Sequence, residues 1–487
     1  MSLKLSEDEI RRRLQDGRNY KRLYRDLKIK YDVVVAENRE LRQLLAAATA
    51  QLETQNIRIA ELETMVFGKR RKPPTGTAVP VSPLSAPASP RDAASYRRPV
   101  PAPDSITDTV QCPVAACARC GGKLGDSTEH VRYVEDVALP GLTPGYIPHL
   151  VTKYVIAKGI CTACGRTTAG RELGGAEVSL GPNVRLLAAD LISRMGLSYS
   201  QVSGLLLGLY GLAVSGGELS NLLGRQHRDW LPAYGRLKAV IRAAPVKHYD
   251  ETPWKIQALQ GGYAWVAADA GSEAVCFALE QSRGARHARA LHGEPSENSV
   301  FVTDGYAAYR NLPGRQQLCW AHLHRGIRDL ACNDSLPERQ RPYCQDWYAS
   351  FAGIYHDLRQ HLAELYDTQR RTQQADLLWQ RVAALADQPA PPEGEPEKLR
   401  RLKAQLRQAG RDRLLVCLTA DAPCDNNRAE RDLRQLVCKR KRSFGSKTQK
   451  GANALATVLS LCTTTWRRAQ RDSNPAGYFT RLAALAG

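Results

Sequence analysis

The chain has 487 residues and a formal net charge of +20, which allows several domains and favours nucleic acid or an anionic membrane surface as partner. It has no hydrophobic run long enough to span a bilayer, and its N-terminus is charged rather than signal-like, so we expect a cytoplasmic protein without a membrane partner. In that compartment the 13 cysteines are expected to be metal ligands or buried thiols rather than disulfides.

Residues 1–67 are predicted to form a coiled-coil helix. Their seam residues recur at alternating spacings of four and three, the heptad pattern of paired helices. Asn38 falls at position a, where a buried Asn favours a parallel homodimer. One long helix packed on its own domain is the alternative, and the Pro-rich segment that follows argues against it. The seam consists of Leu27, Tyr31, Val34, Asn38, Leu41, Leu45, Ala48, Leu52, Gln55, Ile59, Leu62 and Val66.

A linker and a cysteine module come next. Residues 68–110 are rich in Pro, Ala and Ser and bury too little to fold, so we predict a disordered linker.

Residues 111–172 hold two Cys-x2-Cys-Gly pairs, which can supply four thiolates to one structural Zn²⁺, and strands are expected between the pairs. Cys112 is a spare that could replace the first ligand. The predicted ligands are Cys117, Cys120, Cys161 and Cys164.

Residues 173–244 are predicted to be a helical, helix-turn-helix-like region. The stretch SYSQVSGLLLGLYG reads as a helix that ends at Gly211. After a short turn, Ser215 and Glu218 form a capping box for the next helix. The second helix of such a pair could enter a DNA major groove, although any packed pair of helices gives a similar pattern.

Residues 245–326 are predicted to begin a catalytic core. Three strands follow one another in VKHYDETPWKI, GYAWVAADA and AVCFALEQS, then a helix near Ala285–His292 and a fourth strand, SVFVTDGY. A fifth strand is expected in QQLCWAHL. This order is that of a ribonuclease-H-like fold. Residues 327–420 are predicted to be a helical insertion, interrupted at 389–397 by PAPPEGEPE.

Two aspartates are candidates for catalysis because each ends an apolar run of residues in a predicted strand. Asp250 lies in the first strand and Asp304 ends the fourth, so their carboxylates converge if the two strands are neighbours. A third acid, Glu430, lies on a helix that Asp425 or Asn426 would cap. The alternative for Glu430 is a simple exposed ion pair with Arg434, four residues on.

The last segment, 421–487, is predicted to be a catalytic helix and a basic tail. Residues 428–487 hold 13 Lys and Arg against 3 Asp and Glu, so half of the excess positive charge lies there. Three carboxylates can hold two Mg²⁺ ions for in-line displacement at phosphorus, and surrounding cations can hold the DNA backbone. The predicted DNA contacts are Arg428, Arg431, Arg434, Lys439, Arg440, Lys441 and Arg442.

Several of these motifs resemble the insertion sequence 66 family of DDE transposases over nearly the whole chain. The motifs are HYDETPWK, VTDGYAAY, LCWAHLHRGI, DNNRAERDLR and the tail GANALATVLSLCTTT with NPAGYFTRLAAL. The resemblance implies that Asp250, Asp304 and Glu430 form the catalytic triad of a prokaryotic, nucleoid-associated enzyme. It also implies that Cys319 and His322 form a Cys-x2-His signature that shapes the core, because two ligands alone would leave a zinc site incomplete.

The resulting hypothesis is a multidomain α+β DNA transposase. It would bind the ends of its element, cut them and join the 3′-hydroxyl strand to target DNA, and the resemblance suggests that accessory proteins of the same element take part. Two alternatives stay open. One is a catalytically inactive DNA-binding regulator derived from a transposase, and the other is a nuclease that hydrolyses DNA without joining it.

Overall fold

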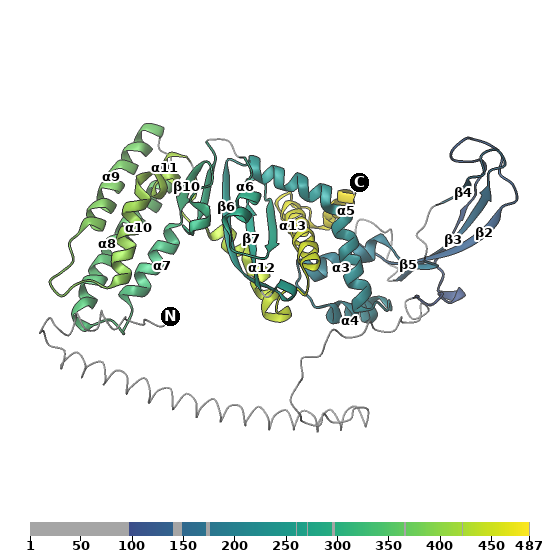
Figure 1. Cartoon of the computed structure of the whole chain (residues 1–487), viewed down its shortest axis with the longest axis horizontal. Helices are drawn as coiled ribbons and strands as arrows, with labels where there is room; N and C mark the ends of the chain where they lie inside the picture. The colour runs from purple at the N-terminus through teal and green to yellow at the C-terminus, as the bar shows by residue number, and fades with distance from the viewer. Residues whose placement is uncertain are drawn as a thin grey trace, which may run out of the picture. The chain divides into compact units, whose positions relative to one another are not determined.

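The computed structural model describes residues 97–486 apart from 140–148, 172–175, 260, 270, 295–297, 365–366 and 421 (Figure 1). Two β-sheets and many helices give the mixed α+β architecture that was predicted. The coiled coil predicted for 1–67 and the linker up to residue 96 lie outside the described residues. None of the described helices is long and apolar enough to cross a membrane.

The first sheet carries the cysteine module. Its long strands β2 and β3 pair antiparallel, and both coincide with the strands predicted between the cysteine pairs. The strand order is β1-β3-β2-β5, with β4 paired to β3. The bounds are β1 Asp108–Cys112, β2 Thr128–Val137, β3 His149–Ile160, β4 Thr167–Ala169 and β5 Val178–Leu180.

The predicted linker ends earlier than residue 110. Asp108–Cys112 form β1, which pairs in parallel with β3 and so satisfies its backbone hydrogen bonds there. Before that strand, the Arg98 guanidinium donates to Glu135 at 2.7 Å and to Glu218 at 3.0 Å. These contacts fix the chain against β2 and the helical region well before the first cysteine.

Three helices follow the first sheet in the region 173–244 that was predicted to be helical, although the beginning of that region forms strand β5, which pairs with β2. The helices are α3 Pro182–Ser193, α4 Tyr199–Tyr210 and α5 Gly216–Ala243. Helix α4 ends at Gly211, whose φ of +67° is the left-handed conformation that glycine adopts easily. The Ser215–Glu218 capping box is present at the beginning of α5. Helix α5 buries Trp230 and Leu237 in the core it shares with the central sheet.

The central sheet has the order β10-β9-β6-β7-β8. Strands β6, β7 and β8 pair antiparallel, whereas β9 pairs in parallel with both β6 and β10. A helix, α6, lies between β8 and β9 in the chain, as predicted. The bounds are β6 Val246–Ile256, β7 Gly261–Ala268, β8 Val275–Glu280, α6 Ala285–His292, β9 Val300–Thr303 and β10 Arg315–Leu318.

The fifth strand is shorter than predicted. The sequence QQLCWAHL was expected to be a strand throughout, but β10 ends at Leu318 and helix α7 begins at Trp320 and continues to Ala331. The reason is a change of period, because Trp320, Leu323 and Ile327 are all buried at helical spacing. The helical insertion then continues with α8 Arg341–Ala363, α9 Thr368–Asp387, α10 Glu397–Leu414 and α11 Val416–Thr419.

The two faces of the central sheet are covered by different helices. Side chains of β7 alternate, so that Trp265 and Ala267 join the core with α5 and α6, whereas Ala264 and Val266 face the other way. That second face is covered by α12 Asn427–Ser443 and α13 Gln449–Arg471, the yellow-green and yellow helices of Figure 1. The chain then ends in α14 Tyr478–Ala483 and short 3-10 turns.

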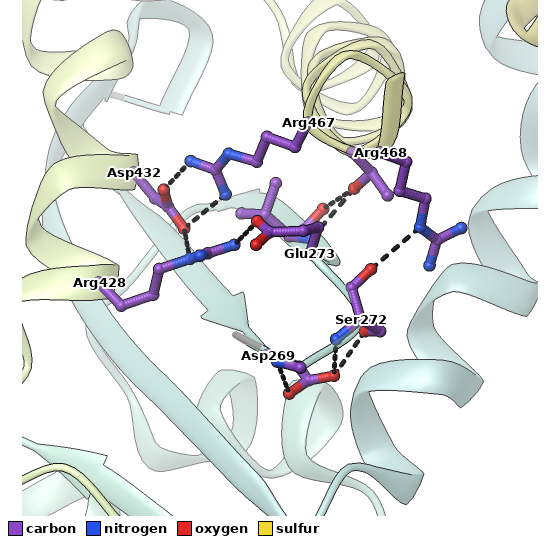
Figure 2. Close-up of polar contacts among 10 residues, drawn as sticks. Asp269, Ser272, Glu273, Arg428, Asp432, Arg467 and Arg468 are labelled. Atoms are coloured by element: carbon purple, nitrogen blue, oxygen red, sulfur yellow. Dashed lines mark hydrogen bonds and ion pairs between the residues drawn. The ribbon is translucent and has the colours of Figure 1, made fainter. Parts of the chain in front are cut away.

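A buried polar network fixes α12 against α13 and the turn between β7 and β8 (Figure 2). Asp432 is fully buried and accepts from Arg467 of α13, with Arg428 also 3.7 Å away. Arg428 reaches on to Glu273 in the turn, at 2.7 Å. Arg468 donates to the backbone carbonyl of Ser272 at 3.0 Å. The helix that carries Glu430 is therefore held by charge as well as by its apolar face.

Removing the Asp432 carboxylate should destabilise this part of the fold. Asp432→Ala leaves the partly buried Arg467 guanidinium without its acceptor and Arg428 with Glu273 alone, which should lower the free energy of unfolding by about 3 kcal/mol. Urea unfolding followed by tryptophan fluorescence measures the change. Asp412→Ala is the control, because that side chain is 94% exposed, and it should change the free energy by less than about 0.5 kcal/mol. Equal losses in both variants would contradict the network.

Candidate functional site

Asp250 and Asp304 both lie just beyond the point where the parallel pairing of β6 with β9 ends, Asp250 within β6 and Asp304 directly after β9. The pairing of β6 with β9 sets His248 opposite Val302, and each aspartate lies two residues further along its own strand direction. The predicted adjacency of these strands is therefore confirmed. Asp304 Oδ1 accepts a hydrogen bond from the Tyr306 amide at 2.8 Å, which fixes the loop that follows β9.

The electrostatics of Asp250 show that other acids are close. Burial raises the pKa of Asp250 to about 8, with further contributions from the negative charges of Glu251, Asp304 and Glu430. A carboxyl group in such surroundings is held protonated near neutral pH unless a cation compensates its charge. The structure thus brings three carboxylates from β6, the end of β9 and α12 into one electrostatic neighbourhood.

The neighbouring acid Glu251 has partners within the protein. Its side chain is 1% exposed and accepts from the Arg283 Nε at 2.8 Å and from the Tyr309 hydroxyl. Arg283 also stacks on the ring of Tyr306, 3.6 Å from its centroid. Because these groups already satisfy the charge of Glu251, its role is to hold the loop after β9 beside Asp250.

Glu430 faces the beginning of α7. Its Oε1 lies 3.4 Å from His322 Nδ1, and its Oε2 lies 3.7 Å from the Arg325 guanidinium. The sequence left open that Glu430 forms a simple exposed ion pair with Arg434. That alternative is wrong, because the neighbours of the carboxylate are His322 and Arg325. The carboxylate side chain is 22% exposed, so Glu430 is half-buried rather than a freely exposed surface acid.

Asn426 ties the beginning of α12 to the strand that carries Asp250. Its Nδ2 donates to the carbonyl of Tyr249 at 2.7 Å, which leaves its Oδ1 to accept from His248 Nδ1 at 3.2 Å. The side chain of Asn426 is fully buried and does not cap the helix. Asp425 serves instead, since its Oδ1 accepts from the Asn427 amide at 3.1 Å. Sequence reasoning named Asn426 only as a cap and missed this link.

Cys319 and His322 lie beside Glu430. The Cys319 amide donates to the carbonyl of Thr303 at 2.8 Å, and its Sγ accepts from the Asn426 amide at 3.2 Å. Burial raises the pKa of the Cys319 thiol to about 11. One ligand atom each from Cys319, His322 and Glu430 lie within 4.8 Å of one another. The Cys-x2-His pair thus joins the ends of β9, α7 and α12, although its role in shaping the core stays a prediction.

The seven cations predicted to contact DNA divide into two groups. Three turn into the protein: Arg428 pairs with Glu273, Lys439 donates to the carbonyl of Ile192 at 2.6 Å, and Arg440 donates to the carbonyl of Pro253. Burial lowers the pKa of Lys439 to about 8. These three side chains are occupied within the fold and are poor candidates for phosphate contacts. The four exposed ones are Arg431, Arg434, Lys441 and Arg442.

The four predicted zinc ligands come together in the first sheet. Cys120 Sγ lies 3.5 Å from both Cys161 Sγ and Cys164 Sγ, and Cys117 Sγ lies 3.7 Å from Cys164 Sγ. Four thiolates bound to tetrahedral zinc at about 2.3 Å would lie about 3.8 Å apart. The cluster therefore can hold one Zn²⁺, and Cys112 is not part of it.

Local turns around the thiols also suit a cation. Backbone amides of Cys120 and Arg119 lower the pKa of Cys117 to about 6. Gly121 and Gly165 have φ values of +71° and +68°, the left-handed conformation that glycine adopts easily in the tight turn after each pair. Backbone amides in the two turns thus favour the thiolate form of Cys117, and those of Cys164 and Ala163 likewise lower the pKa of Cys161, whereas the neighbouring thiols raise the pKa of Cys120.

A comparison with protein-family models matches residues 187–454 to the family described as Transposase IS66 family. The match covers more than half of the 487 residues. It includes Asp250, Asp304 and Glu430 and does not extend to the four clustered cysteines. No curated protein matched the chain.

Substitutions at Cys117 and Cys112 should separate the cluster from the spare thiol. Cys117→Ser should remove about one zinc ion per chain, because only three thiolates would remain in the cluster. Cys112→Ser is the matched control and should leave the zinc content unchanged, although this thiol is also buried. Elemental analysis of desalted protein gives both values. Equal zinc content in the two variants would show that Cys117 is not a ligand.

Proposed function

The chain belongs to the IS66 family of transposases, and from that premise we propose that it cuts DNA at the ends of an insertion element and joins the 3′-hydroxyl to target DNA. The observation that carries the proposal is that Asp250 and Asp304 each lie two residues past the His248–Val302 pair of two neighbouring parallel strands, where burial and the charges of Glu251, Asp304 and Glu430 raise the pKa of Asp250. Strongly perturbed acids of this kind gather at catalytic sites. Asp250, Asp304 and Glu430 are the proposed catalytic residues.

The sheet supports a ribonuclease-H-like core. Numbered along the chain, its strands follow the spatial order 3-2-1-4-5, with the first three antiparallel and the last two parallel to the first. In this arrangement two catalytic acids come from the first and fourth strands, and the third acid comes from a helix after the insertion. The positions of Asp250, Asp304 and Glu430 fit that arrangement.

The proposed site suits Mg²⁺. Asp250, Asp304 and Glu430 offer the hard oxygen ligands that Mg²⁺ prefers, and burial of Asp250 among negative charges leaves it in need of a cation. When bound, two such ions would activate the attacking oxygen and stabilise the leaving oxygen at phosphorus. The protein itself holds the acids together: Asn426 fixes α12 to β6, and the Arg283–Glu251 pair supports the loop after β9.

An exposed cationic strip on α12 is the proposed contact for the DNA backbone. Arg431, Arg434, Lys441 and Arg442 are exposed along the same helix as Glu430. Phe444 follows at the end of the helix and is 72% exposed, in a left-handed conformation with φ of +56°. An exposed aromatic ring beside cations is a suitable surface for stacking on a base.

The proposed assembly rests on the N-terminal heptads. A parallel dimer of residues 1–67, joined by the linker, would bring two active sites to two element ends without fixing their geometry. The clustered cysteines would hold a structural Zn²⁺, and α4 with α5 could contribute to reading the element ends. Accessory proteins encoded by the same element are also proposed to take part in transposition.

Each of the three acids should be required for cutting but not for binding. Asp250→Asn, Asp304→Asn and Glu430→Gln keep the shape of the side chain and remove a charged ligand. Each should lower Mg²⁺-dependent cleavage of element-end DNA by at least about 100-fold, the effect of losing one charge-stabilising group in an active site. Gel shifts should show DNA binding near that of the unchanged protein, and Asp412→Asn is the exposed control. Binding without cleavage by the unchanged protein would favour the inactive regulator.

The exposed and the buried cations should behave differently. Arg434→Ala should weaken DNA binding and reduce the slope of log K against log salt by about one, because it removes one phosphate contact. Arg401→Ala is the control, an equally basic side chain that is 78% exposed on α10. Fluorescence anisotropy between low and moderate salt measures the slopes. Identical slopes for Arg434→Ala and the unchanged protein would remove Arg434 from the interface.

A further inference from the structure

Two buried polar atoms beside Glu430 have no hydrogen-bond partner. Among the described residues, His322 Nδ1 and Glu430 Oε1 are both shielded from solvent, and neither forms a hydrogen bond although they are 3.4 Å apart. Leaving a buried acceptor unsatisfied costs about 1–3 kcal/mol, more for a charged group. The Arg325 guanidinium faces the other carboxylate oxygen, Oε2, so it does not satisfy Oε1.

A cysteine thiol is the third candidate ligand beside these two atoms. Cys319 Sγ lies within 4.8 Å of an imidazole nitrogen of His322 and a carboxylate oxygen of Glu430, and Cys319 is 1% exposed. The spacing Cys-x2-His at the beginning of α7 brings both ligands to one turn of helix. The Asn426 amide donates to Sγ at 3.2 Å, an interaction that would strengthen with a thiolate.

Sulfur, imidazole and carboxylate together select the kind of metal. Mg²⁺ prefers oxygen ligands only, whereas Zn²⁺ binds Cys, His and Glu in tetrahedral sites. Three protein ligands with a fourth position left for water or another group is a common zinc arrangement. The ligand set therefore differs from the three carboxylates and from the four cysteines of the first sheet.

We propose that Cys319, His322 and Glu430 form a second transition-metal site, for which Zn²⁺ is the fitting ion. Because Glu430 is shared, zinc at this site would compete with the proposed Mg²⁺ site for the same carboxylate. Zinc binding itself rests only on the geometry around His322. The competition rests on the proposed function as well.

Counting zinc in the full-length protein tests the site. After saturation with Zn²⁺ and desalting, the unchanged protein should retain about two zinc ions per chain, one in the four-cysteine cluster and one at Cys319. Cys319→Ser, His322→Ala and Glu430→Gln should each retain about one. Cys332→Ser is the matched control, an exposed cysteine that ends the same helix, and it should retain about two.

The outcomes are distinct. One zinc per chain in the unchanged protein overturns the proposal, and this result needs no variant to fold. Two zinc ions that persist in both Cys319→Ser and His322→Ala overturn it as well, because the second ion then lies elsewhere. A protein that cleaves DNA but binds one zinc refutes this site and leaves the proposed function standing. A protein that binds two and does not cleave supports the site and counts against that function.

Discussion

The attachment of α12 to the central sheet is the constraint on which the candidate site depends. Glu430 is 180 residues after Asp250 in the chain, so only tertiary contacts can bring the two carboxylates together. Asn426 supplies one such contact through the carbonyl of Tyr249, the residue before Asp250. The buried Asp432 supplies another through Arg467 of α13. Asn426 and Asp432 lie on either side of Glu430 in the chain, and both are fixed. The helix geometry therefore sets the direction of the Glu430 side chain.

This attachment also explains how a basic helix can carry acids that face a site. Cations on α12 serve two purposes, since Arg428 and Lys439 turn inward to hold the helix while Arg431 and Arg434 stay exposed. Arg428 compensates buried negative charge, Lys439 donates to backbone carbonyls, and the exposed arginines are available to a polyanion. Meanwhile burial, together with the neighbouring negative charges, raises the pKa of Asp250 to about 8. Such an unfavourable arrangement is typical of a site that binds cations rather than of a structural core.

Much of this could be predicted from the sequence where the signal is local. The strands β2, β3 and β6 to β9, the Gly211 helix end, the Ser215 capping box and the cysteine cluster all follow from spacing and turn residues. Contacts between residues that are far apart in the chain could not be predicted from the sequence. Arg428 meets Glu273 across 155 residues, and Asn426 meets Tyr249 across 177, so both were given surface or capping roles instead. The end of β10 was misjudged because a short apolar run fits a strand and a buried helix equally well.

The central claim is that Asp250, Asp304 and Glu430 hold divalent metal in one site. Anomalous diffraction from crystals of the protein bound to element-end DNA and Mn²⁺ tests it most directly, because Mn²⁺ replaces Mg²⁺ and its position is visible. The account predicts anomalous peaks about 2.1 Å from carboxylate oxygens of Asp250 and Asp304, with Glu430 as a further ligand. Peaks whose ligands include neither aspartate, or DNA bound with no Mn²⁺ near these acids, would contradict it.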